Sequence, residues 1–147
     1  MRTFPYRVLV VDDEQDMREE LAALLKEHGF AVDTAQDGQE GLTKLLTDEF
    51  DVALVDLRMP NMDGLTMIRK AYEQEIDTYV IILTGKGDKQ DAVAAIKLRY
   101  TVADWFEKSS LNSTELVKRV TQLAEGLSLE DIDRILADLP KTEREDV

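Results

Sequence analysis

The stretch VALVDLRMPNMDG, residues 52–64, ends an apolar run with an acid and continues into a turn. Val52 to Val55 are all aliphatic, a pattern typical of a strand covered on both faces. Asp56 follows, and residues 59–64 contain the Pro, Asn, Asp and Gly that form tight turns. A charge at the end of a buried strand loses its water, which is costly unless another group replaces it. We therefore expect a partner for Asp56 elsewhere in the chain.

Similar apolar runs recur along the chain and alternate with segments of helical periodicity. Five runs are predicted to be strands: residues 7–11, 31–35, 51–55, 79–83 and 102–106. Apolar residues three and four positions apart predict helices around residues 17–25, 41–46, 65–72, 92–96 and 116–123. Asn112, three residues before Glu115, is expected to cap the last of these helices. This alternation predicts an α/β fold, a doubly wound (βα)5 unit with a five-stranded parallel sheet.

The chain of 147 residues has the usual size of one domain, and its pattern divides at Gly126. Residues 1–126 hold all the predicted strands and their helices. Residues 127–147 are predicted to form one extra C-terminal amphipathic helix of about three turns, followed by a polar tail. The pattern that predicts this helix consists of a capping-box-like start at Ser128 and an apolar stripe of Ile132, Ile135, Leu136 and Leu139, with Pro140 ending it. The sequence leaves open whether this segment is a linker, a dimer contact or a link to an effector domain.

Composition argues against several classes of function. The net charge is −13, and both parts of the chain are acidic, so we expect no direct binding to nucleic acid. There are no cysteines, which excludes disulfides and thiolate chemistry, and the single histidine, His28, offers no basis for a histidine metal cage. No stretch approaches the roughly 20 apolar residues of a membrane span, and the N-terminus lacks a signal-peptide pattern. We expect a cytoplasmic protein without membrane contact.

Chemically useful side chains follow four of the five predicted strands. Residues 12–14, Asp-Asp-Glu, follow the first strand, and Asp56, Thr84 and Lys108 follow the third, fourth and fifth. Ligand sites in such sheets lie beyond the carboxyl ends of the strands. Clustered carboxylates raise one another's pKa, and a hard cation such as Mg2+ relieves the repulsion. A hydroxyl and an ammonium are suited to hold phosphoryl oxygens, and the Asp56 carboxylate is a candidate nucleophile that forms an acyl phosphate.

Four motifs, VLVVDDE, VDLRMPNMDG, VIILTGKGD and DWFEK, occur in this order along residues 6–126. Together they resemble the receiver domain of bacterial two-component response regulators. The resemblance implies the flavodoxin-like receiver fold. It also implies that Asp56 accepts a phosphoryl group from a sensor histidine kinase or a phosphotransfer protein, in a reaction that requires Mg2+.

The resemblance also implies a metal-binding set. Asp13, Asp56 and the backbone carbonyl of Arg58 would bind Mg2+, and Asp12 would assist through a water molecule. The metal and Lys108 together would explain why a carboxylate is tolerated at the end of the buried strand.

A switch is the third implication of the resemblance. Thr84 and Lys108 would contact the phosphoryl group, and Trp105 occupies the position of the switch aromatic, usually Tyr or Phe in the family. On phosphorylation Thr84 moves toward the phosphate, the aromatic side chain turns inward, and the face of the fourth helix, fifth strand and fifth helix changes its partner preference. A homodimer through that face is one expected partner state. Such a domain is a signalling module and not an enzyme. The stretch ILTGKGDKQDAVAAIK further resembles receivers at the front of multidomain transcriptional regulators.

Three features depart from the family pattern. Ser109 follows Lys108 where the family usually has proline in a cis peptide; because a cis bond before another residue is costly, we expect a trans bond and a less firmly held Lys108. The segment KLRYTVADWF, residues 97–106, lacks the usual glycine and is about two residues longer by our alignment. Trp105 is bulkier than the usual switch residue, which restricts its inward rotation.

Three other functions compete with the phosphoacceptor hypothesis. A degenerate receiver that binds partners independently of phosphorylation is favoured by the departures and opposed by the intact acids, Thr84 and Lys108. Aspartyl-nucleophile phosphatases resemble a D-x-D pattern after the first strand, whereas this chain has DDE there and its candidate nucleophile follows the third strand. A flavin-binding flavodoxin-like protein needs a Ser/Thr/Gly-rich loop after the first strand, where DDEQD would repel a phosphate. The partner kinase and the regulated process are not encoded in any pattern that we find.

Overall fold

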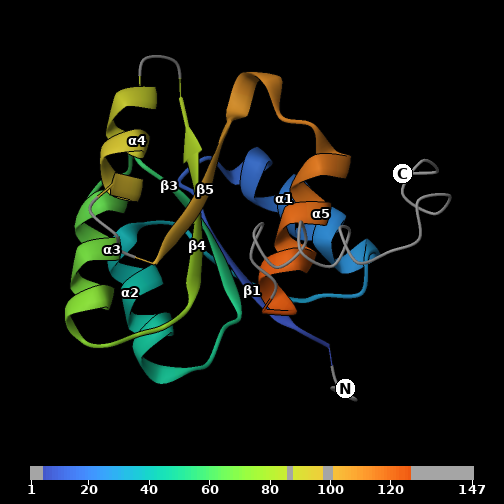
Figure 1. The fold of residues 1–147 in the computed structure, drawn as a ribbon, viewed down its shortest axis with the longest axis horizontal. Coiled ribbons are helices and arrows are strands. Elements are labelled where there is room, and N and C mark those ends of the chain that lie inside the picture. The colour runs from blue at the N-terminus through green and yellow to red at the C-terminus, as the bar shows by residue number, and fades with distance from the viewer. Residues whose placement is uncertain (1–4, 86–87, 98–100, 127–147) are drawn as a thin grey trace, which may run out of the picture.

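A computed structural model describes residues 5–85, 88–97 and 101–126 and contains one sheet of five parallel strands (Figure 1). The strands are β1 (Arg7–Val11), β2 (Ala31–Ala35), β3 (Val52–Asp56), β4 (Tyr79–Thr84) and β5 (Val102–Glu107). The helices are α1 (Gln15–Glu27), α2 (Gly38–Thr47), α3 (Gly64–Glu73), α4 (Lys89–Lys97) and α5 (Ser113–Ala124), with a short 3-10 turn at Lys108–Ser110. The strand order is β2-β1-β3-β4-β5, which confirms the predicted doubly wound (βα)5 fold.

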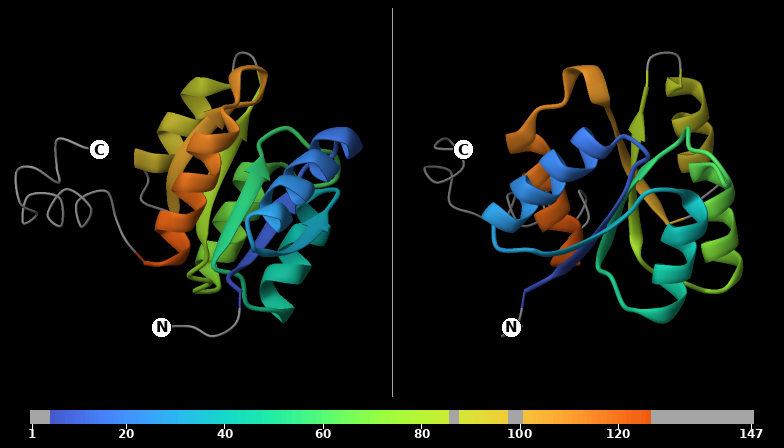
Figure 2. Two further views of the ribbon diagram at one scale, coloured as in Figure 1. Left: turned by 90° about the vertical axis from the view of Figure 1, so that its right-hand side faces the viewer. Right: turned by 180° about the vertical axis from the view of Figure 1, so that it is seen from behind.

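Helices cover both faces of the sheet, with α2, α3 and α4 on one side and α1 and α5 on the other (Figures 1 and 2). The side chains of alternate strand residues point into the two resulting core layers. Leu9 and Val55 belong to the layer under α2–α4, and Val10 and Leu54 belong to the layer under α1 and α5. Because both faces are buried, the strands have to be apolar at successive positions, which is the pattern the sequence shows.

Polar residues at the helix ends set where the elements begin and end. Asp63 accepts a hydrogen bond from the Thr66 N–H at 2.8 Å and so caps α3 at the end of the MPNMDG turn. Asn112 accepts one from the Glu115 N–H at 3.0 Å, which confirms the predicted cap of α5. Each side-chain cap satisfies one of the amide groups that the first turn of a helix leaves without a partner.

A bulge in β5 sets the direction of Trp105. Val80 pairs with Val102 but Ile81 pairs with Asp104, so Ala103 is an extra residue in β5. Strict alternation from Val102 would send Trp105 to the opposite face of the sheet. With the extra residue, Val102 and Trp105 both pack against the layer under α2–α4.

Two predictions concern segments that the structure does not describe, wholly or in part. The C-terminal helix predicted within residues 127–147 lies outside the described residues, as do residues 98–100 of the lengthened segment. Among the described residues, no helix combines the length and the apolar character that a membrane crossing requires.

Candidate functional site

The predicted acids meet at the carboxyl ends of β1 and β3, the adjacent strands between which the strand order reverses. One carboxylate oxygen from each of Asp12, Asp13, Glu14 and Asp56 lies within 4.8 Å of the others. Asp12 and Asp56 are buried, with exposed fractions of 0% and 4%, whereas Asp13 and Glu14 are exposed. The sequence therefore brings two buried and two solvent-facing carboxylates together, from segments more than 40 residues apart.

The turn after β3 holds Asp56 at this position through close backbone packing. The Gly64 N–H donates to the Leu57 carbonyl at 3.0 Å, which folds the turn back onto the strand end. A Cβ atom on Gly64 would lie 2.3 Å from the carbonyl oxygen of Asp56, so only glycine fits there. Asn61 adopts the left-handed conformation with φ 67, and its side-chain amide donates to Asp37 at the start of α2. Gly64 of the motif is thus a geometric requirement of the turn.

Lys108 reaches the acids from the end of β5. Its Nζ atom lies 2.9 Å from Asp12 Oδ2, 2.9 Å from Glu14 Oε1 and 3.0 Å from Asp56 Oδ2. The side chain of Lys108 is only 11% exposed, so these contacts are shielded from water. No cis peptide bond occurs among the described residues, and Lys108 is nevertheless held by three carboxylates. The expectation of a loosely placed Lys108 is therefore not met.

Burial and neighbouring charges perturb the acid–base properties of this cluster. Burial raises the pKa of Asp56 from 3.8 to about 7; the Lys108 ammonium opposes the rise, and the neighbouring Asp12 carboxylate adds to it. Burial alone would lower the pKa of Lys108, but its contacts with Asp12, Glu14 and Asp56 raise it above its ordinary value. Lys108 is therefore a permanent cation, and the cluster holds more acidic groups than this one cation can neutralise.

The donor set fits a hard divalent cation. Carboxylate oxygens from four residues converge, and two of those residues face solvent, where a cation can enter with bound water. Asp12 Oδ1 accepts from the Glu14 N–H at 2.9 Å. Asp12 Oδ2 is fully buried and, despite its electrostatic contact with Lys108, has no donor in hydrogen-bond geometry among the described residues. A buried carboxylate oxygen in that state is suited to a bound cation or its water.

Thr84 and Trp105 flank the acid cluster but do not belong to it. Thr84 is fully buried, and its hydroxyl donates to the Phe106 carbonyl at 3.3 Å. Within the described part of the chain, no hydrogen bond joins the Thr84 hydroxyl to Asp56. Trp105 is partly buried, and the Lys89 ammonium of α4 lies 5.4 Å from the centre of its ring. Trp105 thus connects β5 with α4, three residues before Lys108.

Two features of the site were not expected from the sequence. Glu14 was noted only as part of the DDE run; its side chain leaves the α1 start uncapped and contacts Lys108 instead. The Arg58 side chain was not considered at all, although its Nε atom lies 2.9 Å from Asp88 Oδ1 and its Nη2 atom 3.3 Å from Asp91 Oδ2. Arg58 thereby ties the turn after Asp56 to the first turn of α4. No pattern in the sequence marks this long-range pair, because its members are 30 residues apart.

The fold and site together define an α/β domain with an acidic, lysine-containing site at the strand ends. The family described as response regulator receiver domain matches residues 8–121, most of the chain. This chain therefore belongs to the response regulator receiver domain family. It is 35% identical over 114 residues to the transcriptional regulatory protein DltR of Streptococcus agalactiae; the match covers 78% of this chain and 50% of DltR. The chain thus spans about half the length of the curated relatives it matches.

Solved receiver structures share the fold over almost their whole length. The receiver domain of the Francisella response regulator 1452 superposes with a TM-score of 0.75 at 29% identity, covering 82% of this chain and 97% of that chain. The response regulator TrrA of Thermotoga maritima, solved in complex with Mg2+-BeF, superposes with a TM-score of 0.70 at 31% identity. That superposition covers 80% of this chain and 98% of TrrA. These comparisons confirm the family and the flavodoxin-like fold that the motifs implied.

Proposed function

We propose that this receiver domain accepts a phosphoryl group on Asp56 from the phosphohistidine of a sensor histidine kinase or a phosphotransfer protein. The observation that carries the proposal is the arrangement of Lys108 between Asp12, Glu14 and Asp56 at the strand ends. A lone buried aspartate would simply be protonated and inert. An aspartate that shares an ammonium and lies beside further acids suits metal-assisted phosphoryl transfer.

In the proposed reaction an Asp56 carboxylate oxygen attacks the phosphorus atom. A P–O bond forms, the P–N bond to the histidine breaks, and its electron pair stays on the imidazole nitrogen. Asp13, Asp56 and the Arg58 carbonyl would hold Mg2+, with Asp12 acting through water; when bound, the cation neutralises carboxylate and phosphoryl charge. The Lys108 ammonium favours the ionised form of Asp56 and would then pair with a phosphoryl oxygen.

Thr84 and Trp105 are the proposed route from the site to the surface. The Thr84 hydroxyl now donates to the Phe106 carbonyl, so moving toward a phosphoryl group breaks a contact with β5. Trp105 lies on that strand and touches Lys89 of α4. The α4–β5–α5 face would then change its partner preference, including a homodimer through this face. In this role the domain is a signalling switch, not an enzyme, and does not itself bind nucleic acid.

Intact-mass spectrometry after incubation with acetyl phosphate and Mg2+ tests the proposal. We expect one phosphoryl increment on the wild type and none on Asp56→Asn or in EDTA. Asp77→Asn is the matched control, because Asp77 is an exposed aspartate at the opposite edge of the sheet and should leave the increment intact. An increment on Asp56→Asn would remove the nucleophile assignment. No increment on the wild type, while another receiver is modified in parallel, would favour the degenerate receiver that acts without phosphorylation.

A further inference from the structure

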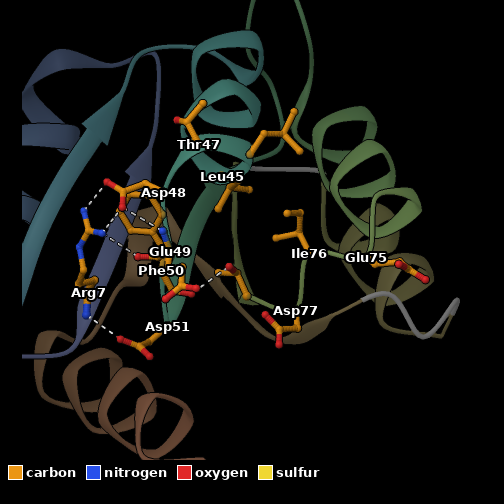
Figure 3. Close-up of a pocket in the computed structure, with 12 residues that line it drawn as sticks. Arg7, Leu45, Thr47, Asp48, Glu49, Phe50, Asp51, Glu75, Ile76 and Asp77 are labelled. Carbon is orange, nitrogen blue, oxygen red and sulfur yellow. Dashed lines mark hydrogen bonds and ion pairs between the residues drawn. The ribbon is translucent and has the colours of Figure 1, made fainter. Parts of the chain in front are cut away.

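An open hollow lies away from the acid cluster, at the amino-terminal edge of the sheet (Figure 3). Its volume is about 900 Å³, in the range of ligand-binding clefts. Its walls are formed by the start of β1, the end of α2 and the two loops that lead into β3 and β4. We call it the basal groove; its lining residues are Arg7, Leu45, Leu46, Thr47, Asp48, Glu49, Phe50, Asp51, Glu75, Ile76, Asp77 and Thr78.

Apolar side chains form part of this groove. Leu45 and Ile76 lie in the middle of the view, between Arg7 on one side and Glu75 on the other (Figure 3). Leu46 is 43% exposed at the groove. The described residues contain three exposed large hydrophobic side chains, and the other two, Tyr72 and Tyr79, also lie near this edge, at the end of α3 and the start of β4. Exposed apolar groups gathered at one end of a domain are typical of a contact surface.

The charge of the basal groove is strongly negative. Five carboxylates line it and Arg7 is the single cation among the lining residues. Arg7 is already engaged, because its guanidinium forms an ion pair with Asp48, donates to the Glu49 carbonyl and lies over the Phe50 ring. Among the described residues, Glu75 and Asp77 have no ion pair or side-chain hydrogen bond. The groove therefore has uncompensated negative charge beside its apolar wall.

A second, smaller hollow lengthens this surface toward β5. Its volume is about 490 Å³, and it shares Glu75, Ile76 and Asp77 with the basal groove while adding Tyr72 and Thr101. The two hollows together bring the exposed apolar side chains of Leu46 and Tyr72 and the shared acids Glu75 and Asp77 onto one continuous surface. Two adjoining hollows that share lining residues suit a peptide segment better than a compact small molecule.

We propose that the basal groove docks a cationic amphipathic segment of a partner protein. Lysine or arginine side chains of the segment would pair with Glu75 and Asp77, and a bulky apolar side chain would pack between Leu46 and Ile76. Nucleic acid and anionic membranes are excluded as partners by the sign of the charge. The groove lies at the opposite sheet edge from Asp56, so this inference stands independently of the proposed phosphoryl transfer and both sites can be occupied together.

The probe is a fluorescein-labelled amphipathic helical peptide of about 12 lysine and leucine residues, with an apolar stripe at helical spacing. A scrambled peptide of the same composition lacks the stripe and keeps the charge. We expect the ordered peptide to bind the full chain saturably at about 150 mM NaCl, and to shift the amide NMR signals of the groove residues while leaving those of residues 12–14 and 56 unchanged. The scrambled peptide should bind at least about fivefold more weakly if the apolar wall contributes.

Two variants separate docking from general charge attraction. Glu75→Gln with Asp77→Asn should weaken the ordered peptide about tenfold, because it removes two unpaired carboxylates. Asp16→Asn with Glu20→Gln makes the same chemical change at two exposed acids of α1 and should weaken binding less than twofold. Leu46→Ala, at an exposed position, should weaken binding about threefold with the fold intact. Equal losses for the two double variants, signal shifts spread over the surface, or no saturable binding up to about 1 mM peptide would overturn the proposal.

Discussion

The two edges of the sheet are both acidic, but they use their acids differently. At the carboxyl edge, Asp12 and Asp56 are buried and share the shielded Lys108. At the amino edge, the acids line an open groove, and Arg7 pairs with the exposed Asp48. Burial raises the pKa of Asp56 to about 7, whereas the hydrogen bond from Arg7 lowers the pKa of Asp48 to about 2. The pKa of an aspartate is thus shifted in opposite directions at the two edges.

This difference shows that burial, rather than acid content, decides what a carboxylate does. A buried carboxylate loses its water and becomes sensitive to one cation, one metal or one phosphoryl group. An exposed carboxylate keeps its water, stays ionised and contributes a screened surface potential. The carboxyl edge is therefore suited to chemistry and the amino edge to attraction of a cationic partner. Three predictions test this contrast, beginning with the largest expected effect.

Removing the cation from each edge should have very unequal effects on stability. Lys108→Met leaves the buried Asp12 and Asp56 without their shared ammonium and should lower the free energy of unfolding by about 3 kcal/mol at neutral pH in EDTA. Arg7→Met removes the corresponding cation from an exposed pair and should cost less than about 1 kcal/mol. Urea unfolding followed by circular dichroism measures both.

The Lys108→Met loss should shrink when Mg2+ is added, since a divalent cation replaces the missing charge. If Lys108→Met and Arg7→Met lower the free energy of unfolding equally, the two edges are electrostatically alike and the proposed difference between them is wrong.

Neutralising one aspartate at each edge should change stability in opposite directions. The pKa of Asp56 is about 7 in the folded chain against 3.8 as the reference value, so between these pH values the unfolded chain releases a proton that the folded chain retains. The wild type loses stability as the pH rises through this window, and Asp56→Asn should therefore be more stable by about 2 kcal/mol near pH 8 in EDTA. The gain should disappear below about pH 3, where the folded and the unfolded chain both carry the proton.

Asp48→Asn is the opposite case. The lowered pKa of Asp48 means that its contribution is present above 3.8 and is lost as the pH falls through about 2. This variant should therefore be less stable than the wild type at neutral pH. Chemical unfolding across the pH range gives both curves, and a pH-independent effect of Asp56→Asn would contradict the assignment of a raised pKa.

The smallest effect concerns the backbone of the basal groove. Glu75 holds the left-handed conformation, with φ 62, just after α3, where Gly29 with φ 90 follows α1. Because glycine adopts this conformation without a steric penalty, Glu75→Gly should raise the free energy of unfolding by about 0.5–1 kcal/mol while removing a groove carboxylate. Gly29→Ala should lower it by about 1 kcal/mol.

Gly29 is a matched control because an added Cβ atom there has no neighbour within 4 Å. The loss of stability in Gly29→Ala therefore comes only from the backbone conformation. Thermal unfolding of the two variants provides the comparison. Destabilisation by Glu75→Gly would show that the Glu75 side chain stabilises the fold and is not held in place for docking.

The sequence predicted the fold and the gathering of its strand-end acids and Lys108 at one edge of the sheet, because both follow from local patterns. Continuous apolar runs indicate strands buried on two faces, and an alternating parallel sheet brings their carboxyl ends to one edge. The third strand was predicted at residues 51–55 and lies at Val52–Asp56, a shift of one residue that left Asp56 at the strand end. Long-range pairs were less accessible: Arg58 with Asp88, and Glu14 with Lys108, are joined only by the folded chain.

The sequence by itself determined that strands end in acids, a threonine and a lysine, and that a Pro/Asn/Asp/Gly turn follows Asp56. These are properties of neighbouring residues. Only the tertiary structure decided which acids are buried, that Lys108 reaches three of them, and that the bulge at Ala103 turns Trp105 toward the α4 side of the sheet. The physical reason is that burial, pKa and strand register depend on distances between residues far apart along the chain, and folding alone sets those distances.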